Sequence, residues 1–294
     1  MAVRANLSSI RVGDGFPVRV LGVINLTQGS FYKGSIRSLG PAVGSSAASM
    51  AELGADAVDV GASSTAPYLK AHLSANEELD MIRRAVRSIV DATSLPISVD
   101  TSYSKVADAA LSAGATIVND VTGLNYDPAL ADTILDHSAS AIIMAKSTGY
   151  MRGSPPRSVA RILARSLKIA TEAGIPAKNV VLDPGIGFFR NVGSGRAFSR
   201  QDIMPWYKWD CSVIRNLDSI TALGRPVCVG VSRKSFIGHL SGRPDPSDRL
   251  AGSISAASIA VYNGASMVRT HDVRETIDAV KIAEALRSAR SFKE

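Results

Sequence analysis

Short apolar runs rich in valine and isoleucine alternate along the chain with longer segments in which apolar residues recur every three or four positions. The first pattern is typical of buried parallel strands, and the second is typical of helices that cover a sheet. Strands are predicted at residues 19–25, 55–60, 97–100, 116–120, 140–145, 179–183, 226–231 and 266–270. Helices are predicted at residues 40–53, 75–92, 103–113, 127–136, 156–173, 198–217, 246–262 and 272–290. Several of these helices end at a glycine, such as Gly114 and Gly174, which readily adopts the left-handed conformation that ends a helix.

Eight strands that alternate with eight helices over 294 residues predict an α/β fold, and they favour a (β/α)8 TIM barrel. A doubly wound sheet is the alternative, but it would normally carry a glycine-rich phosphate loop where residues 25–30 read Asn-Leu-Thr-Gln-Gly-Ser. Residues 10–18 predict a hairpin that turns at residues 13–15 and could close the bottom of a barrel. No linker divides the remainder, so we expect an N-terminal hairpin in residues 1–18 and a single barrel domain in residues 19–294.

Most of the predicted strands end in a polar residue. These residues are Asn25, Asp59, Asp100, Asn119, Asp183, Ser232 and Arg269. The clearest case is Val-Val-Leu-Asp-Pro-Gly-Ile-Gly-Phe at residues 180–188, where a β-branched run leads to Asp183 and a glycine-rich turn. Barrel enzymes carry their active sites at the carboxyl ends of the strands, so we expect these polar side chains to gather in one mouth.

Four of these polar groups predict a site for a flat heterocycle. Asp100 and Asp183 accept hydrogen bonds, Asn119 both donates and accepts, and Lys234 donates from the loop after the seventh strand. A planar ring whose edge alternates donors and acceptors would satisfy such a set.

A second group predicts a phosphate site. Arg269 and His271 follow the eighth strand, and barrels often bind phosphate beyond strands seven and eight. Asn25 offers a neutral oxygen, which suits a magnesium ion that keeps most of its waters and contacts substrate phosphates.

Other readings of single residues stay open at this point. Asp59 and Asp272 fit a helix N-cap as well as a site. Met144 and Phe188 fit the core as well as a pocket wall. The chain shows neither a Ser/His/Asp order nor a His-x-x-x-His spacing, so hydrolase and zinc functions have little support.

Charge and composition limit the kinds of ligand and the cellular location that we expect. The net charge is +7, but lysine and arginine are scattered, which favours attraction of a small anionic substrate over nucleic-acid binding. No apolar run reaches the roughly 20 residues of a membrane span, and residues 1–16 lack a secretory pattern, so a cytoplasmic protein is expected. Cys211 and Cys228 have no metal-ligand spacing and are expected to be free thiols.

Taken together, these segments resemble the dihydropteroate synthase family. The matching segments are Gly-Val-Ile-Asn-Leu-Thr at 22–27 with Ser-Phe at 30–31, Asp-Val-Gly at 59–61 with Ser-Thr at 64–65, Ser-Val-Asp-Thr at 98–101, Val-Asn-Asp-Val at 118–121, Leu-Asp-Pro-Gly-Ile-Gly-Phe at 182–188, Ser-Arg-Lys-Ser at 232–235 and Arg-Thr-His-Asp at 269–272. Their order and spacing hold from about residue 19 to the end of the chain.

The resemblance implies a (β/α)8 barrel, commonly a homodimer, that joins 6-hydroxymethyl-7,8-dihydropterin pyrophosphate to an arylamine and releases pyrophosphate in folate or methanopterin biosynthesis. It implies that the pterin is bound by Asp100, Asn119, Asp183 and Lys234, with Met144 and Phe188 beside it. It implies that pyrophosphate is bound by Asn25, Thr65, Arg269 and His271, with Mg²⁺ at Asn25. It places the arylamine near Thr65, Pro67 and Ser235, and it makes Asn25, Lys234, Arg269 and His271 the catalytic set.

Two loops depart from the family pattern. Residues 27–31 read Thr-Gln-Gly-Ser-Phe where the family has Thr-Pro-Asp-Ser-Phe, so Gly29 replaces an acid. Residues 63–67 read Ser-Ser-Thr-Ala-Pro where the family has Glu-Ser-Thr-Arg-Pro, so Ala66 replaces an arginine. These versions look more like archaeal members, some of whose pathways use a ribosyl-phosphate arylamine in place of p-aminobenzoate.

Three other functions share parts of this pattern. A non-catalytic pterin-binding paralogue would bind the pterin and form no product. A pterin-dependent corrinoid methyltransferase would bind a methylated reduced pterin and release no pyrophosphate, and Arg269 with His271 argues against it. An unrelated phosphosugar enzyme would need a Schiff-base lysine inside the barrel, whereas Lys234 follows a strand.

Overall fold

The computed structural model describes residues 2–26, 36–62, 75–146, 153–189 and 204–289. Eight parallel strands form one sheet in the order β8-β7-β6-β5-β4-β3-β10-β9. A parallel bridge from Leu182 to Val227 then joins β8 to the residue before β9, so the sheet nearly closes into a barrel. The strands are β3 (Arg19–Asn25), β4 (Ala57–Gly61), β5 (Ile97–Asp100), β6 (Ile117–Asp120), β7 (Ser140–Met144), β8 (Val180–Asp183), β9 (Cys228–Gly230) and β10 (Met267–Thr270). The predicted TIM barrel is confirmed.

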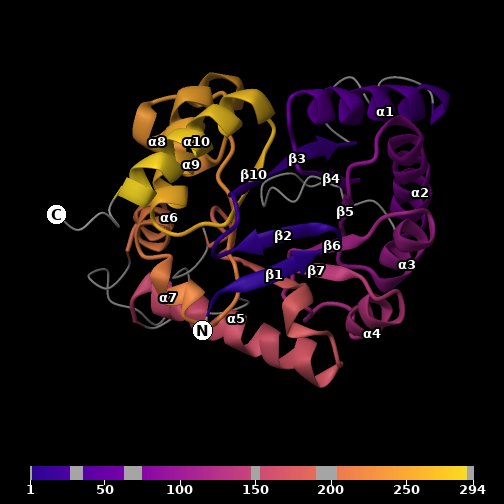
Figure 1. The fold of residues 1–294 in the computed structure, drawn as a ribbon, viewed down its shortest axis with the longest axis horizontal. Helices are drawn as coiled ribbons and strands as arrows, with labels where there is room; N and C mark the ends of the chain where they lie inside the picture. The colour runs from indigo at the N-terminus through magenta and orange to yellow at the C-terminus, as the bar shows by residue number, and fades with distance from the viewer. Residues whose placement is uncertain (1, 27–35, 63–74, 147–152, 190–203, 290–294) are drawn as a thin grey trace.

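Helices surround the strands on the outside (Figure 1). They are α1 (Ile36–Glu52), α2 (Ala75–Ala92), α3 (Ser104–Ser112), α4 (Ala129–Asp136), α5 (Pro155–Glu172), α6 (Trp206–Arg215), α7 (Asp218–Thr221), α8 (Ser235–Ser241), α9 (Leu250–Tyr262) and α10 (Val273–Ala289), with short 3₁₀ turns η2 (Ala177–Asn179) and η3 (Pro246–Arg249). Their apolar faces and the outward side chains of the strands make the main core, in which Val60, Val99, Val118 and Leu182 are completely or almost completely buried. None of the helices in these described ranges is long and apolar enough to cross a membrane.

Two helices differ from the prediction. The helix expected at residues 198–217 begins at Trp206, after Pro205, and breaks at Asn216 before the short α7; residues 198–203 lie outside the described part. Helix α8 was not predicted, because Gly242 ends it in a left-handed conformation after seven residues. That is too short for a helical repeat of apolar residues to emerge from the sequence.

The N-terminal hairpin lies earlier in the chain than predicted. Strands β1 (Arg4–Leu7) and β2 (Ile10–Gly13) pair in antiparallel fashion, so the turn lies at residues 8–9. The chain does turn at residues 13–15, where the amide of Phe16 donates to the carbonyl of Gly13 at 3.0 Å, but this turn follows the second strand and does not join the two strands, so the predicted hairpin turn was misplaced. Apolar side chains alternate from residue 5 to residue 12, and the prediction started this alternation too late.

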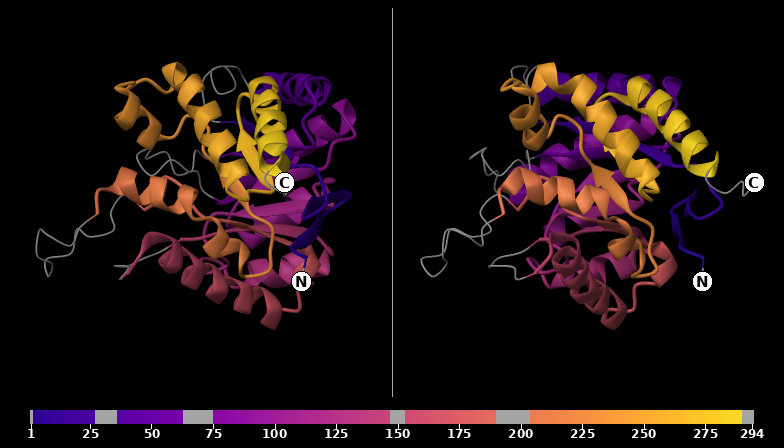
Figure 2. Two further views of the ribbon diagram at one scale, coloured as in Figure 1. Left: turned by 60° about the vertical axis from the view of Figure 1, so that its left-hand side comes forward. Right: turned by 90° about the vertical axis from the view of Figure 1, so that its left-hand side faces the viewer.

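The hairpin closes the amino-terminal end of the barrel, as expected. Figure 2 shows it at one end of the strands. Ser140, at the start of β7, fixes it, because its hydroxyl accepts from the amide of Ser8 at 2.9 Å and donates to the carbonyl of Asn6 at 3.1 Å. Its buried side chains pack against a layer of inward-facing strand residues. This apolar layer comprises Leu21, Ala57, Ile117, Ile142, Val181, Cys228 and Met267.

A polar layer lies directly above the apolar layer. Side chains on a strand alternate between its two faces, so residues two positions apart share the barrel interior. Asp59 therefore follows Ala57, and Arg269 follows Met267, on the inward face. Asn119 and Asp183 stand in the same relation to Ile117 and Val181. This period of two carries the polar groups to the carboxyl-terminal mouth of the barrel.

Candidate functional site

Arg269 lies at the centre of the polar layer. Its Nε donates to Oδ2 of Asp59 at 2.6 Å, and its Nη2 donates to Oδ2 of Asp100 at 2.9 Å. Asp59 is completely buried and accepts further hydrogen bonds from Ser98 Oγ at 2.6 Å and from Asn119 Nδ2 at 3.2 Å. Strands β4, β5, β6 and β10 therefore share one hydrogen-bonded network across the barrel.

Asp59 has a larger role in the site than the sequence analysis predicted. A helix N-cap fitted it as well as a site, yet Asp59 lies within β4 and points into the barrel. The useful signal was its spacing of two from Ala57, which faces the interior. Its position between a cation and two neutral donors makes it a support for Arg269 and Asn119.

Asp100 keeps one oxygen free for a ligand. Its Oδ1 is buried and has no hydrogen-bond partner among the residues that the structure describes. Buried polar atoms are normally hydrogen-bonded, so this oxygen marks a place where a ligand group can bind. Burial raises the pKa of Asp100 to about 7, because the attraction of Arg269, which it shares with Asp59, offsets the burial only in part. Gly61 makes room beside it, since a Cβ there would lie 3.2 Å from the Cβ of Asp100.

Asp183 and Lys234 form the other half of the mouth. Asp183 ends β8, and its Oδ1 accepts from the amide of Gly185 at 2.7 Å. Burial raises the pKa of Asp183, and this hydrogen bond opposes the rise. Burial lowers the pKa of Lys234 to about 8, and the nearby Asp183 opposes that fall. The Lys234 ammonium lies 4.5 Å from the centroid of the Phe188 ring, within the range of a cation–π contact.

The loop after β8 is shaped around Lys234. Gly187 has φ of +84°, which favours glycine, and a Cβ there would lie 3.1 Å from Cδ of Lys234 and press on that side chain. The amide of Gly187 donates to Oδ1 of the buried Asp210 at 2.9 Å. Asp210 lies on α6 in the outer layer, and no sequence pattern distinguished it from an ordinary helical acid.

His271 follows β10 and contacts residues in or just after the two neighbouring strands of the sheet, β3 and β9. Its Nδ1 lies 3.0 Å from Ser232 Oγ, and its Nε2 lies 3.1 Å from Asn25 Nδ2. Burial, followed by the charge of Arg269, lowers the pKa of His271 to about 4, although part of its side chain remains exposed. The ring is therefore neutral at neutral pH in the ligand-free site. It can therefore offer a hydrogen bond, but no positive charge, to an anion.

Most of the predicted site residues come together at this mouth. The structure brings there Asn25, Asp100, Asn119, Asp183, Phe188, Lys234, Arg269 and His271. Met144 is buried at the end of β7 in register with Asp183, and Ser235 is the first residue of α8. Thr65 and Pro67, like the altered positions Gly29 and Ala66, lie outside the described residues, so their roles remain predictions.

The residues present fit a weakly held magnesium ion. With Nδ2 of Asn25 turned to His271, the amide oxygen of Asn25 is the atom left for a cation. The described ranges hold no group of three or more His, Cys, Asp or Glu side chains that could bind a metal by themselves. Magnesium at one protein oxygen, completed by waters and substrate phosphates, agrees with this sparse set.

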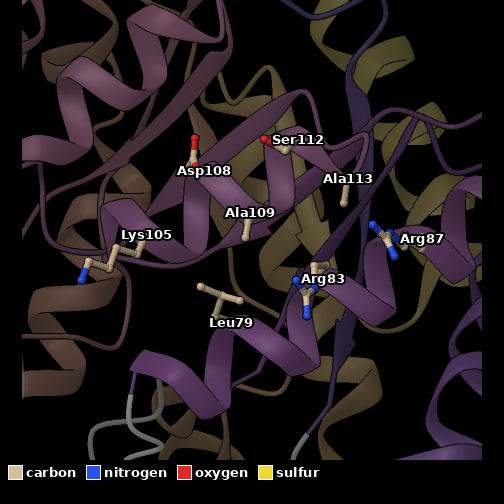
Figure 3. Close-up of a pocket in the computed structure, with 8 residues that line it drawn as sticks. All are labelled: Leu79, Arg83, Arg87, Lys105, Asp108, Ala109, Ser112 and Ala113. Carbon is tan, nitrogen blue, oxygen red and sulfur yellow. The ribbon is translucent and has the colours of Figure 1, made fainter.

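A separate groove lies on the outer face of the barrel, between α2 and α3 (Figure 3). Its volume is about 470 Å³, and it contains the basic residues Arg83, Arg87 and Lys105. Asp108 at its edge pairs with His137 at 2.8 Å. The groove is formed by covering helices, so it is distinct from the mouth at the strand ends.

Comparison with known proteins agrees with the fold. Residues 21–271 match the family described as pterin binding enzyme. The chain is 32% identical over 268 residues to the dihydropteroate synthase of Bacillus subtilis, covering 91% of this chain and 88% of that protein. The dihydropteroate synthase of Xanthomonas albilineans, solved with 4-aminobenzoic acid, superimposes with a TM-score of 0.84 at 31% identity over 100% of both chains. The same enzyme in complex with 7,8-dihydropteroate gives a TM-score of 0.81 at 30% identity, covering 99% of this chain and 100% of that one.

An α/β barrel with carboxylates and an amide converging on its mouth defines an enzyme that binds a polar planar ligand. The chain belongs to the pterin binding enzyme family. Its similarity to dihydropteroate synthases over nearly its whole length makes it a transferase of that type.

Proposed function

We propose that the protein joins 6-hydroxymethyl-7,8-dihydropterin pyrophosphate to an arylamine, as dihydropteroate synthases do, and releases pyrophosphate. The observation that carries the proposal is the buried Oδ1 of Asp100, an acceptor with no partner among the described residues, in a mouth that also holds Asn119 and Asp183. A pterin edge supplies the ring and exocyclic N–H groups that these atoms require.

Each half of the mouth then has its own task. Asp100, Asn119, Asp183 and Lys234 bind the pterin ring and hold it in one orientation. Positioning of this kind lowers the barrier because the reacting carbon and the leaving group are held in a fixed geometry. Asn25, His271 and the positively charged Arg269 lie on the β3 and β10 side, where the pyrophosphate would lie.

In the reaction a C–O bond breaks, a C–N bond forms and the amine gives up one proton. The bond between the methylene carbon and the pyrophosphate oxygen breaks, and its electron pair leaves with pyrophosphate. The pterin ring stabilises the methylene cation that remains, and the amine nitrogen attacks this carbon and then loses a proton to solvent. Arg269 is well suited to the growing negative charge, because Asp59 and Asp100 outweigh its burial and keep it cationic. A magnesium ion at Asn25 would supply further positive charge to the departing phosphates.

The acceptor that we propose is p-aminobenzoate. Support comes from the Xanthomonas albilineans enzyme, which was solved with 4-aminobenzoic acid. The alternative is a ribosyl-phosphate arylamine, suggested by Ala66 in place of an arginine. Lys146, which is exposed beyond β7, lies on the mouth side of the barrel and is a candidate partner for such a phosphate.

We also propose that the active form is a homodimer. Several large apolar side chains are exposed on the three C-terminal helices, which is consistent with a surface covered by a second copy. They are Leu240, Ile259, Ile282 and Leu286. Light scattering of the purified protein tests this expectation, and a monomer at micromolar concentration contradicts it.

The deciding experiment is incubation with the pterin pyrophosphate, Mg²⁺ and each arylamine in turn, followed by mass spectrometry of the product. A condensed pterin–arylamine product with equimolar pyrophosphate is expected for p-aminobenzoate. Product from the ribosyl-phosphate arylamine alone would change the acceptor. Pterin binding by calorimetry without any product would identify a non-catalytic pterin-binding protein.

A further inference from the structure

The turn that carries Lys234 has an arginine in an unfavourable backbone conformation. The amide of Lys234 donates to the carbonyl of Val231 at 3.3 Å, which closes a four-residue turn with Arg233 in its third position. Arg233 has φ of +56°, a left-handed value for which that turn position normally selects glycine or asparagine. A residue kept in such a conformation must be held by its surroundings.

Three groups hold Arg233. The hydroxyl of Ser253 accepts from its amide at 2.8 Å, and Nη1 of Arg249 donates to its carbonyl at 3.0 Å. Its guanidinium forms a two-point ion pair with Asp272, through Nε to Oδ2 at 3.1 Å and Nη2 to Oδ1 at 2.6 Å. Arg249 is itself buried and also donates to the carbonyl of Arg243 at 3.0 Å. The backbone of Arg233 is therefore anchored to α9 and η3, while its side chain crosses to the next loop.

The ion pair joins Arg233 and Asp272, and each of them is the chain neighbour of a proposed substrate-binding residue. Lys234 follows Arg233 directly, and His271 directly precedes Asp272. A second link runs parallel to it, because the amide of His271 donates to Ser232 Oγ at 3.3 Å and the His271 ring contacts the same oxygen. The loops after β9 and β10 are thereby tied together by two neighbouring links.

We infer that Arg233 is a positioning residue, whose ion pair with Asp272 fixes Lys234 and His271 relative to each other and so couples the pterin and pyrophosphate halves of the site. The geometry explains why an arginine occupies a position that favours glycine. A glycine would form the turn with less strain but could not reach Asp272. Lysine would keep the charge but not the planar fork that makes two parallel hydrogen bonds. The expected change in kcat/KM rests on the proposed function. The expected change in the positions of Lys234 and His271 does not.

The kinetic test compares Arg233→Lys and Arg233→Gly with a matched control, Arg19→Lys. Arg19 pairs with Asp56 at 2.9 Å near the amino-terminal end of the barrel, remote from the mouth. Both Arg233 variants are expected to lose about 10- to 100-fold in kcat/KM for the pterin pyrophosphate, because small displacements of reacting groups cost this much. Arg19→Lys is expected to keep the wild-type kcat/KM, even if its melting temperature falls.

A second measurement does not depend on turnover. At one fixed pH, the backbone amide resonances of Lys234 and His271 are expected to move in Arg233→Lys relative to the wild type, because the loops after β9 and β10 lose their two-point link, and to stay in place in Arg19→Lys. The charge at position 233 is unchanged in this variant, so a shift reports movement and not the lost cation. Wild-type kinetics together with unmoved amide resonances of Lys234 and His271 in Arg233→Lys would overturn the inference.

The two proposals fail in different ways. If the wild type forms no product, the proposed function fails, and the amide resonances of Lys234 and His271 still decide whether the ion pair positions the two loops. If the wild type is active and both Arg233 variants merely melt at lower temperature, Arg233 has a structural role alone and the inference is overturned.

Discussion

Arg269 and Asp59 are 210 positions apart in the chain, yet the Nε of one lies 2.6 Å from the Oδ2 of the other inside the barrel. Asp59 is completely buried, and Arg269 is its cationic partner at the base of the mouth. A buried charge of this kind is tolerated because it is paired and hydrogen-bonded. The contact therefore supports both the fold and the orientation of the groups above it.

Asp59→Ala is expected to destabilise the protein by about 3–5 kcal/mol, because it removes one partner from a buried ion pair. Arg269 would then pair with Asp100 alone, and Asn119 would lose its acceptor. Urea unfolding measures the stability change, with Asp91→Ala on the exposed surface of α2 as the control. Equal stability of the two variants would contradict a supporting role for Asp59.

Asp183→Ala is expected to weaken pterin binding by about 100-fold or more, since hydrogen bonds to a charged group are each worth about 1.5–3 kcal/mol. Asp183→Asn still accepts from Gly185, so its loop should remain in place while the charge is lost. Isothermal calorimetry with the reduced pterin measures both affinities. Wild-type affinity in Asp183→Ala would exclude the pterin position described above.

Lys234 is expected to make stability depend on alkaline pH. Its pKa falls from 10.5 to about 8 on folding, mainly through burial, so the unfolded chain binds more protons between these two values. Stability therefore rises as pH increases through this window, and it is lower below pH 8. The partly exposed side chain limits the effect to about 2 kcal/mol. The difference in unfolding free energy between wild type and Lys234→Met, measured from pH 7 to 10, should increase with pH. A flat difference would show that Lys234 is not desolvated.

Leu7→Ala tests whether the hairpin is a structural plug. Leu7 is completely buried against the apolar layer, so a loss of about 2–5 kcal/mol is expected from the lost burial and the cavity. The mouth lies at the other end of the strands, so kcat and KM below the melting temperature should stay at wild-type values. A large change in KM would imply that the hairpin influences the site.

Magnesium removal is expected to separate the two halves of the site. Asn25 is the proposed protein ligand, and the phosphates of the substrate complete the coordination. A chelator should therefore weaken binding of the pterin pyrophosphate and leave binding of the pterin without phosphates unchanged. Calorimetry with both ligands measures this, and an equal loss for both would place the metal elsewhere.

The strand ends could be predicted because each depends on a local pattern. Asp100, Asn119 and Asp183 each end a short apolar run, and parallel strands necessarily bring such ends to one edge. The period of two along each strand then fixes which residues face the interior. For this reason the barrel and most of the site followed from the sequence.

The remaining contacts depend on partners far apart in the chain. No local pattern shows that Asp59 pairs with Arg269, or that Asp210 on an outer helix accepts from Gly187. The neutral state of His271 likewise depends on burial and on Arg269, which only the folded structure brings together. The hairpin turn was misplaced for a different reason: residues 13–15 do form a turn, but it leads out of the second strand, and glycine at a turn does not show which strands the turn joins.

The hairpin that closes the amino-terminal end of the barrel limits how small molecules enter and leave. Because Leu7, Ile10 and Val12 fill the amino-terminal end, a molecule cannot pass straight through the barrel. Substrates must enter, and products must leave, through the carboxyl-terminal mouth. A product that stays bound therefore blocks the next substrate. An inhibitor bound at the level of Asp59 and Asp100 can therefore be extended toward the mouth, but not toward the hairpin.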